Sequence, residues 1–302
     1  MTGSNSRMLS SDVITEFRGR GYEIRVHPLS FSEFLEAGQY DSELSALQDF
    51  MIYGGMPQVV SFSSKEEKEK YLKSLFKGTY IRDIKDRYGI RNDDDLSELI
   101  DIIASNIGCL TNPTNLENTF KSVKGHSISD TTIQNYLGML QDAFMLEKAI
   151  RYDIKGKHYI NTPSKYYFED VGLRNARLNY RQIDGGHLME NIIYNELRIR
   201  GYSVDVGQVE VRQMNNEGKK IRKLLEVDFI CNRGNKRIYI QSALDMPTQE
   251  KIAQETNSLC HIKDGFPKIV IVGGLTPSYV NEDGISIINV IDFLKDKEGM
   301  LL

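Results

Sequence analysis

Apolar and polar positions follow the clearest pattern in the C-terminal part of the chain. Residues 188–200 carry an apolar stripe at helical spacing, and two apolar runs of strand length follow at 224–230 and 237–243. The turn residues at 232–235 separate these runs, which is typical of a β-hairpin. The same pattern predicts one more helix, at 249–258, and three more strands, at 204–213, 268–272 and 285–290. We therefore expect an α/β domain over residues 166–302.

Residues 95–165 predict three helices followed by a hairpin. Helices are expected at 96–106, at 115–121 and after Ser129, a favourable N-cap. Alternating segments at 146–152 and 157–160 then flank a Lys-Gly-Lys turn. This order of elements is typical of a winged-helix domain, in which the third helix enters the major groove of DNA and the wing contacts the backbone.

Residues 31–94 are predicted to be helical. Ser30 is the expected N-cap of the first helix, residues 53–57 form a turn, and residues 64–88 form a long charged helix. Before them, the first thirty residues predict a polar loop, a short helix and a strand at 22–26. The pattern thus predicts segments 1–94, 95–165 and 166–302, an α/β chain with a mixed sheet at its C-terminal end.

Composition adds few constraints. The 302 residues carry a net charge of −4, with 40% apolar and 26% charged residues, so any attraction to nucleic acid has to be local. The three cysteines are far apart, which argues against a disulfide framework or a zinc site and favours a reducing cytoplasm. No apolar run approaches the roughly 20 residues of a membrane helix, and no signal-peptide pattern opens the chain. We expect no membrane partner.

Two carboxylates occupy positions where burial is expected. Glu190 lies early on the predicted helix, and Asp228 interrupts the apolar run 224–230, with Glu226 nearby. A buried carboxylate needs a hydrogen-bond partner, an opposite charge or a metal ion. The next strand carries polar residues at Gln241 and Ser242, so we expect Glu190, Asp228 and Gln241 to meet at one edge of the sheet.

These residues resemble the PD-(D/E)XK nuclease fold. The resemblance rests on GxxxE in the helix, the following Gly-Tyr, the motif Glu-Val-Asp-Phe-Ile at 226–230 and the hairpin partner. It implies a Mg²⁺ site at Glu190 and Asp228. The Glu-x-Lys of active members is replaced by Gln241-Ser242-Ala243, which implies a silent site unless another lysine, such as Lys236 or Lys251, compensates.

Three longer motifs resemble a narrower group, the uncharacterised C-terminal domain of AAA-family (AAA+) ATPases. They are KYYFEDVGLRNA at 165–176, YIQSA at 239–243 and HIKDGFPK at 261–268. The resemblance makes residues 1–94 an AAA+ remnant with helical lid, with Asn5 in a sensor position and Arg18 or Arg20 in the arginine-finger region. No phosphate-binding loop or Walker B aspartate strand occurs in the chain, so ATP belongs to full-length relatives only and we expect no ATPase activity of this chain alone.

Three functions remain open from the sequence. One is a non-catalytic nucleic-acid-binding or regulatory module, one is a protein-interaction module that pairs with a complete ATPase subunit or with itself, and one is a metal-dependent nuclease with rearranged residues. The candidate DNA contacts lie on the third helix, the wing and the basic run before 224. They are Gln134, Asn135, Arg151, Lys155, Lys157, Lys219 and Lys220.

Overall fold

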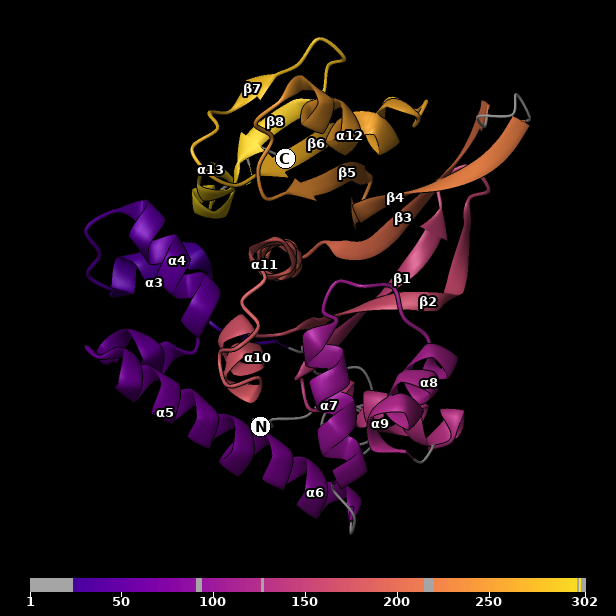
Figure 1. The fold of residues 1–302 in the computed structure, drawn as a ribbon. Coiled ribbons are helices and arrows are strands. Elements are labelled where there is room, and N and C mark those ends of the chain that lie inside the picture. Colours follow the sequence, from indigo (N-terminus) through magenta and orange to yellow (C-terminus); the bar gives the residue numbers. More distant parts are fainter. Residues whose placement is uncertain (1–23, 91–93, 126–127, 215–219, 298, 300–302) are drawn as a thin grey trace.

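The computed structural model describes residues 24–90, 94–125, 128–214, 220–297 and 299. The predictions for Asn5, Arg18, Arg20 and Lys219 lie outside these residues. The described chain forms one large mixed sheet with helices around it (Figure 1). The predicted mixed α/β class is confirmed at this level. None of the helices in the described ranges has both the length and the apolar character that crossing a bilayer requires.

Eight strands build the sheet in the order β2-β1-β3-β4-β5-β6-β8-β7. Neighbours β1/β2, β3/β4, β4/β5 and β7/β8 are antiparallel, and β1/β3, β5/β6 and β6/β8 are parallel. The strands are β1 (Leu146–Asp153), β2 (His158–Phe168), β3 (Ser203–Met214), β4 (Lys220–Arg233), β5 (Lys236–Ala243), β6 (Lys268–Val272), β7 (Tyr279–Val280) and β8 (Ser286–Asn289). The hairpin predicted from the turn at 232–235 is confirmed, since Arg233 pairs with Lys236.

Most helices lie in predicted segments, but the helices at 171–177 and 290–295 were not predicted. A turn of π-helix, η2 (Phe76–Ile81), divides the long helix predicted at 64–88, and a short 3₁₀ segment, η1 (Pro57–Ser61), follows the predicted turn. The α-helices are α3 (Phe31–Ala37), α4 (Glu43–Tyr53), α5 (Lys65–Leu75), α6 (Arg82–Tyr88), α7 (Asp94–Ser105), α8 (Pro113–Lys124), α9 (Asp130–Asp142), α10 (Val171–Arg177), α11 (Gly185–Ile199), α12 (Gln249–Cys260) and α13 (Val290–Lys295).

Side-chain caps fix where several helices begin. Ser30 accepts a hydrogen bond from the Glu33 N–H, and the Glu33 carboxylate accepts one from the Ser30 N–H at 2.8 Å. Ser129 accepts from the Thr132 N–H at 3.2 Å. Such caps satisfy N–H groups that have no partner inside the helix. Both N-caps predicted from the sequence are therefore confirmed.

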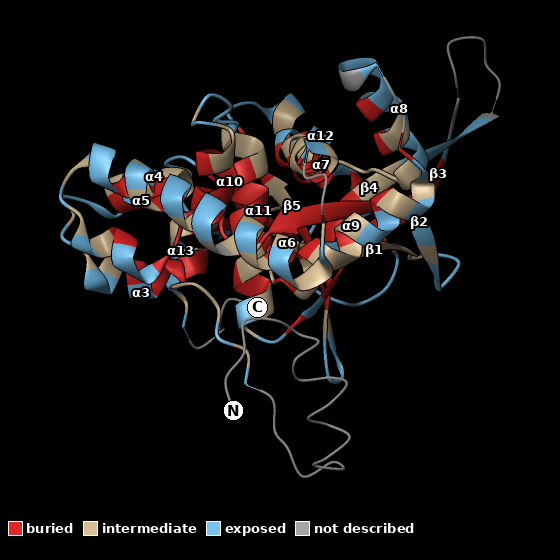
Figure 2. Cartoon of the chain, turned by 90° about the horizontal axis from the view of Figure 1, so that it is seen from below, coloured by how far each residue is buried: buried red, intermediate tan, exposed pale blue. Residues whose placement is uncertain are grey.

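Helices cover both faces of the sheet, and alternate residues of β5 show which helix lies on which face. Ile238 and Ile240 pack into the larger core together with α11, whereas Tyr239 packs into a second core together with α12. Because successive side chains of a strand point to opposite faces, α11 and α12 lie on opposite sides of the sheet. Figure 2 shows the buried residues concentrated on α10, α11 and the central strands.

The hairpin expected to be a wing belongs to the large sheet. Helices α7, α8 and α9 precede β1 and β2 in the predicted order, but β1 also pairs in parallel with β3, from Arg151–Val206 to Asp153–Gln208. The boundary predicted at 165/166 lies inside β2. Hydrogen bonds between strands therefore run without interruption across the two segments.

A close backbone contact joins the N-terminal helices to α10. Gly54 has a φ of 70°, and a Cβ there would lie 2.3 Å from the Asp170 carboxylate. The Gly55 N–H donates to that carboxylate at 2.7 Å. A Cβ on Gly172 would lie 1.9 Å from the Tyr53 carbonyl oxygen. The turn predicted at 53–57 is thus pressed directly against the first turn of α10.

Replacing Gly172 by alanine is expected to lower the free energy of unfolding by about 1–3 kcal/mol, because the added methyl group meets backbone that cannot move aside cheaply. Gly138, inside α9, is the matched control, since nothing lies within 4 Å of a Cβ there. The Gly138→Ala change should stabilise the protein by about 0.5–1 kcal/mol. Urea unfolding of both variants checks the pair, and equal effects would contradict the proposed close contact.

Candidate functional site

The predicted carboxylates Glu190 and Asp228 meet in the fold, and a lysine lies between them. Glu190 lies on α11, Asp228 on β4 and Lys165 on β2. The Lys165 Nζ lies 2.9 Å from Glu190 Oε1, 3.4 Å from Asp228 Oδ1 and 2.6 Å from Glu226 Oε1. The Tyr167 hydroxyl also donates to Glu190 Oε1, at 2.6 Å. We call Lys165, Tyr167, Glu190, Glu226 and Asp228 the lysine–carboxylate cluster.

Strand geometry brings these residues together. Lys165 and Tyr167 are two positions apart on β2, and Glu226 and Asp228 are two apart on β4, so each pair shares a face. Between the pairs Asp205–Ile230 and Gly207–Val227, β4 contains one more residue than β3. Asp228 and Phe229 are the two residues of this β-bulge, and bulges commonly redirect side chains near functional sites.

Gln241 lies beside Asp228 as predicted, one position beyond the Phe229–Ile240 pair, but it binds the backbone of Asp228. Its side-chain oxygen accepts from the Asp228 backbone N–H at 3.4 Å and from the Ser258 hydroxyl at 3.5 Å, so it does not contact the Asp228 carboxylate. That carboxylate instead accepts from the Ser242 N–H at 2.8 Å. Neither lysine suggested as a substitute is in the cluster: Lys251 pairs with Glu255, and Lys236 is exposed at the start of β5.

Burial and the neighbouring charges together set the protonation states of Lys165 and Asp228. The side chain of Lys165 is 3% exposed. Burial by itself lowers the pKa of its ammonium, but Glu190, Asp228 and Glu226 outweigh burial and raise that pKa. Burial also raises the pKa of the Asp228 carboxyl to about 6, although Lys165 acts in the opposite direction. Lys165 is therefore a fixed cation at neutral pH and has no free pair with which to act as a base.

A divalent metal ion does not fit this arrangement as it stands. The oxygens of Glu190 and Asp228 that face one another are the same atoms that accept from Lys165. Within the described ranges, no group of three or more His, Cys, Asp or Glu side chains converges in a way that could hold a metal ion. The cation between the two carboxylates is the lysine ammonium rather than the Mg²⁺ that the resemblance implies.

The rim of the cluster contains a cysteine and a histidine. His187, on the first turn of α11, has Nδ1 4.0 Å from Glu190 Oε2 and Nε2 3.9 Å from the Cys109 sulfur. Burial raises the pKa of the Cys109 thiol, so this thiol is a weak nucleophile at neutral pH. The most open member of the cluster is Glu226, whose side chain is 36% exposed.

Sequence analysis missed Lys165, although a signal for it was present. The residue begins the motif KYYF at 165–168, where a lysine enters an otherwise apolar strand. Lysine is almost never fully buried unless it is paired. A lysine in such a run therefore predicts a carboxylate partner, but its position in sequence does not identify the partner.

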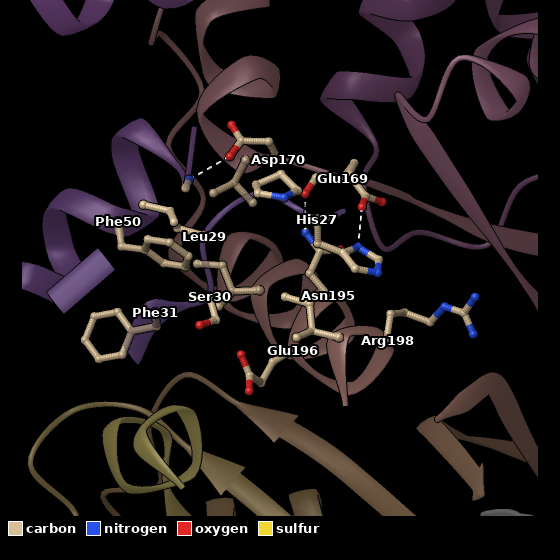
Figure 3. A pocket seen from close by; sticks show the side chains of 15 residues that line it. His27, Leu29, Ser30, Phe31, Phe50, Glu169, Asp170, Asn195, Glu196 and Arg198 are labelled. Atoms are coloured by element: carbon tan, nitrogen blue, oxygen red, sulfur yellow. Dashed lines mark hydrogen bonds and ion pairs between the residues drawn. The ribbon is translucent and has the colours of Figure 1, made fainter. Parts of the chain in front are cut away.

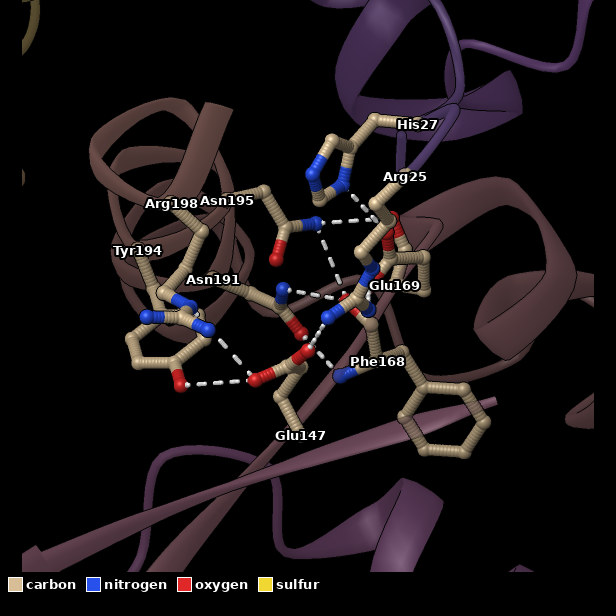
Figure 4. Close-up of polar contacts among 9 residues, drawn as sticks. All are labelled: Arg25, His27, Glu147, Phe168, Glu169, Asn191, Tyr194, Asn195 and Arg198. Atoms are coloured by element: carbon tan, nitrogen blue, oxygen red, sulfur yellow. Dashed lines mark hydrogen bonds and ion pairs between the residues drawn. The ribbon is translucent and has the colours of Figure 1, made fainter. Parts of the chain in front are cut away.

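A polar network fixes the end of β2 beside the cluster (Figure 4). The Asn191 side chain accepts from the Phe168 N–H at 2.9 Å and donates to the Phe168 carbonyl at 2.8 Å. Asn195 donates to the carbonyls of Phe168 and Glu169. The two asparagines of α11 therefore hold the backbone that leads from Lys165 into α10.

A small cavity opens beside this network, between residues 27–31 and the C-terminal half of α11 (Figure 3). His27 Nδ1 lies 2.6 Å from Glu169 Oε1, and Arg25 pairs with Glu169 at 2.7 Å. The cavity measures about 30 Å³, enough for a water molecule or two but not for a nucleotide. The ion pairs of this region hold the segment that precedes α3 against the sheet.

The predicted nucleic-acid contacts lie on several surfaces. Gln134 and Asn135 are exposed on α9, Arg151 is half-buried on β1, and Lys155 and Lys157 are exposed in the β1–β2 turn. The Ile154 N–H donates to the Gln208 carbonyl at 3.0 Å, so this turn lies against β3. Lys220 begins β4, where Arg222 and Lys223 are exposed.

Comparisons with known proteins give relatives without an assigned activity. A family model described as a domain of unknown function (DUF8612) matches residues 44–184. An uncharacterised protein of Haemophilus influenzae is 36% identical over 301 residues, which cover 97% of this chain and 70% of that protein. The uncharacterised protein MJ1544 of Methanocaldococcus jannaschii is 27% identical over 290 residues, which cover 90% of this chain and 64% of that protein.

Among solved structures, the crystal structure of protein VC1899 from Vibrio cholerae covers 70% of this chain and 56% of its own chain. Its identity is 17% and its TM-score is 0.27, too low to support an argument about fold. The similarity to the bacterial relative, in contrast, extends over nearly the whole chain. The chain therefore belongs to the same family as the Haemophilus influenzae protein.

Proposed function

We propose that this chain is a catalytically silent, nuclease-like module of an AAA-family ATPase, and that it works by binding nucleic acid. The ATPase part of the proposal comes from the motif resemblance at 165–176 and 261–268. The nuclease-like part is supported by a mixed sheet with carboxylates on α11 and β4 and a hairpin partner in β5.

The observation that carries the proposed silence is the lysine ammonium held by three carboxylates. Phosphodiester cleavage in the resembled fold needs carboxylates that bind a metal ion and orient a water molecule. Here the carboxylates of Glu190 and Asp228 already hold Lys165, and the Lys165 side chain is 3% exposed. A cation so buried and so tightly paired has no route to a phosphate.

Binding of nucleic acid is supported by basic residues on neighbouring hairpins. The β1–β2 turn carries Lys155 and Lys157 beside β3, and the β3–β4 hairpin extends past the rest of the sheet (Figure 1). Arg212 and Arg222 face each other across that hairpin in register. Exposed cations on adjacent projections give the local attraction to phosphates that the acidic net charge does not.

A second candidate is a nuclease with rearranged residues, which Lys165 favours because a lysine does stand beside the carboxylates. The two candidates differ in one measurement. Incubation with supercoiled, linear and branched DNA in Mg²⁺ or Mn²⁺ is expected to give no cleavage. If the wild type cleaves DNA and a folded Asp228→Ala variant does not, the silent-site proposal is wrong and the nuclease alternative holds.

The binding itself is expected to depend on Lys155 and Lys157. Replacing Lys155 and Lys157 with glutamate should weaken DNA binding and reduce the magnitude of the slope of log K against log[salt] by roughly 0.9 for each lost phosphate contact. Fluorescence anisotropy at several salt concentrations measures both quantities. The same change at Lys65 and Lys70, exposed on α5, is the control. Lys68 is unsuitable because it is buried against Asp49.

Equal weakening by the two double variants would mean that attraction to DNA is general and does not use the β1–β2 turn. No binding at any salt concentration would overturn the nucleic-acid part of the proposal and leave the protein-interaction module as the remaining alternative.

A further inference from the structure

A row of aromatic rings crosses the face of the sheet that α12 covers, next to Lys155 and Lys157 of the β1–β2 turn. The Tyr159 and Tyr152 rings lie 5.1 Å apart, centroid to centroid, at an interplanar angle of 70°. The Arg237 guanidinium lies 5.3 Å from the centre of the Tyr152 ring and 5.7 Å from the centre of the Phe266 ring. We call Tyr159, Tyr152, Arg237 and Phe266 the aromatic row. It brings together β2, β1, β5 and the loop before β6.

Both ends of the aromatic row are open to solvent. Tyr159 is 55% exposed and Phe266 is 40% exposed, while Tyr152 and Arg237 between them are half-buried. Packing of the core explains Tyr239, which is buried beneath Phe266 at 6.4 Å between centroids. Packing does not explain a tyrosine and a phenylalanine that leave about half of their surface in water.

Hydrogen bonds hold the Tyr159 and Arg237 side chains and the loop that carries Phe266. The Tyr159 hydroxyl donates to Asp205 Oδ2 at 3.2 Å, and Arg237 Nε donates to Asn232 Oδ1 at 2.8 Å. Asp264 accepts from the Phe266 N–H at 3.2 Å. A ligand that stacks on groups already held in position loses less side-chain entropy on binding than one that has to order them.

Exposed cations lie on both sides of the aromatic row. The β1–β2 turn, which leads directly into Tyr159, supplies Lys155 and Lys157. The β4–β5 turn before Arg237 supplies Arg233 and Lys236, and Lys263 precedes Phe266. Asp153, Asp205 and Asp264 are nearby acids; Asp153 accepts from the Gly156 N–H, and the other two accept from tyrosine hydroxyls. Rings between exposed cations suit a ligand with flat faces and a negative backbone.

We propose that the aromatic row is a stacking platform for the bases of single-stranded nucleic acid, with the flanking lysines and arginines contacting its phosphates. This inference rests on the proposed nucleic-acid binding and names the strand form that the chain recognises. Bases in a duplex already stack on one another, whereas unpaired bases present their faces to aromatic side chains and to arginine. Stacking tolerates any base, so the platform selects strand form rather than sequence.

A single introduced tryptophan tests the contact directly, because the chain contains no tryptophan. In the Tyr159→Trp variant, a poly(dT) or poly(U) oligonucleotide is expected to quench the tryptophan fluorescence to saturation. Tyr279, on β7 at the opposite edge of the sheet, is the matched control because it is 40% exposed and lies away from the row. Tyr279→Trp should show no saturable quenching. Comparing the two polymers distinguishes DNA from RNA as the ligand.

Anisotropy with the labelled oligonucleotide gives a second test. Tyr159→Leu and Phe266→Leu should each weaken binding by about 5- to 150-fold, the range expected for the loss of one stacked base. The salt slope should stay unchanged because phosphate contacts remain. Tyr159→Phe keeps the ring and loses only the hydrogen bond to Asp205, so it should weaken binding much less than Tyr159→Leu, and Tyr279→Leu should not change the affinity. An unlabelled duplex of the same length should compete poorly.

The outcomes separate the two proposals. Binding that survives both leucine substitutions, or that favours the duplex, would overturn the stacking platform and leave the proposed nucleic-acid binding intact. No binding of either strand form would overturn both. Quenching at position 159 together with selective loss of affinity at Tyr159 and Phe266 would support the platform.

Discussion

The Lys165→Met variant is expected to lose about 3–5 kcal/mol of unfolding free energy at neutral pH, the usual cost of removing one partner from a buried ion pair. The reason is local charge. Glu190, Glu226 and Asp228 all lie within 3.4 Å of the Lys165 ammonium, and the methionine side chain carries no charge to replace it. Chemical denaturation of the wild type and the variant measures the loss.

A divalent cation should recover part of that stability. Without the ammonium, three carboxylate side chains face one space, and oxygen ligands of this kind suit Mg²⁺ or Mn²⁺. We therefore expect Mn²⁺ to raise the melting temperature of Lys165→Met but not that of the wild type. The double variant Lys165→Met, Asp228→Asn should lose less stability than the sum of the single variants, because the two residues interact directly.

Lys68→Met is the control for losing a buried lysine. Lys68 has 8% relative exposure and pairs at 2.8 Å with Asp49, whose side chain is 28% exposed and so keeps contact with water when left alone. We expect a smaller loss there and no effect of Mn²⁺. Equal losses of stability at the two lysines would show that Lys165 does not offset a special repulsion among Glu190, Glu226 and Asp228.

The second large effect is expected at Asp170, the N-cap of α10. Its carboxylate accepts from the Gly55 N–H at 2.7 Å and from the Leu173 N–H at 2.9 Å. In Asp170→Asn one of these oxygens becomes an NH₂ group that faces an N–H. A buried donor left without a partner costs about 1–3 kcal/mol, and the lost hydrogen bonds to a charged group add to this. Urea unfolding at neutral pH measures the deficit.

The deficit of Asp170→Asn should grow at acid pH. Burial raises the pKa of the Asp170 carboxyl from 3.8 to about 6, against the opposing effect of the backbone N–H groups. A carboxyl whose pKa is higher in the folded protein stabilises the fold fully below pH 3.8, and this contribution is lost as the pH rises through 6. The asparagine lacks that titration, so the variant should fall further behind the wild type at pH 4 than at pH 7, by up to about 3 kcal/mol.

Asp184, the N-cap of α11, provides the control. It is exposed and accepts from the His187 N–H at 3.2 Å. Asparagine is an equally good N-cap in water, so Asp184→Asn should be nearly neutral at every pH. A deficit of Asp170→Asn that shrinks at pH 4 would contradict the direction of the pKa shift.

The local features of this fold were predictable because local signals specify them. The strand predicted at 268–272 is observed with the same bounds as β6, since a buried parallel strand is a continuous apolar run. Helix α12 begins at Gln249, as predicted, because Thr248 caps it. The hairpin of β4 and β5 followed from the turn residues between them.

The long-range arrangement was not predictable in the same way. Lys165 meets Glu190 and Asp228 across 25 and 63 positions, and no local pattern encodes such a pairing. Asp228 and Gln241 do lie side by side, one position beyond the Phe229–Ile240 pair, because the hairpin that joins them is regular. The pairing of β1 with β3 also joins strands separated by two helices, so the sequence suggested separate domains where the sheet is continuous.

That continuity determines how the chain can be divided into fragments. A cut at residue 165 would split β2 and leave β1 on a different piece from β3. The detached β3 would then present a row of unpaired N–H and C=O groups, an edge that readily pairs with other molecules and leads to aggregation. A fragment of this family that is meant to stay monomeric should therefore keep β1 and β2 attached to the strands that follow them.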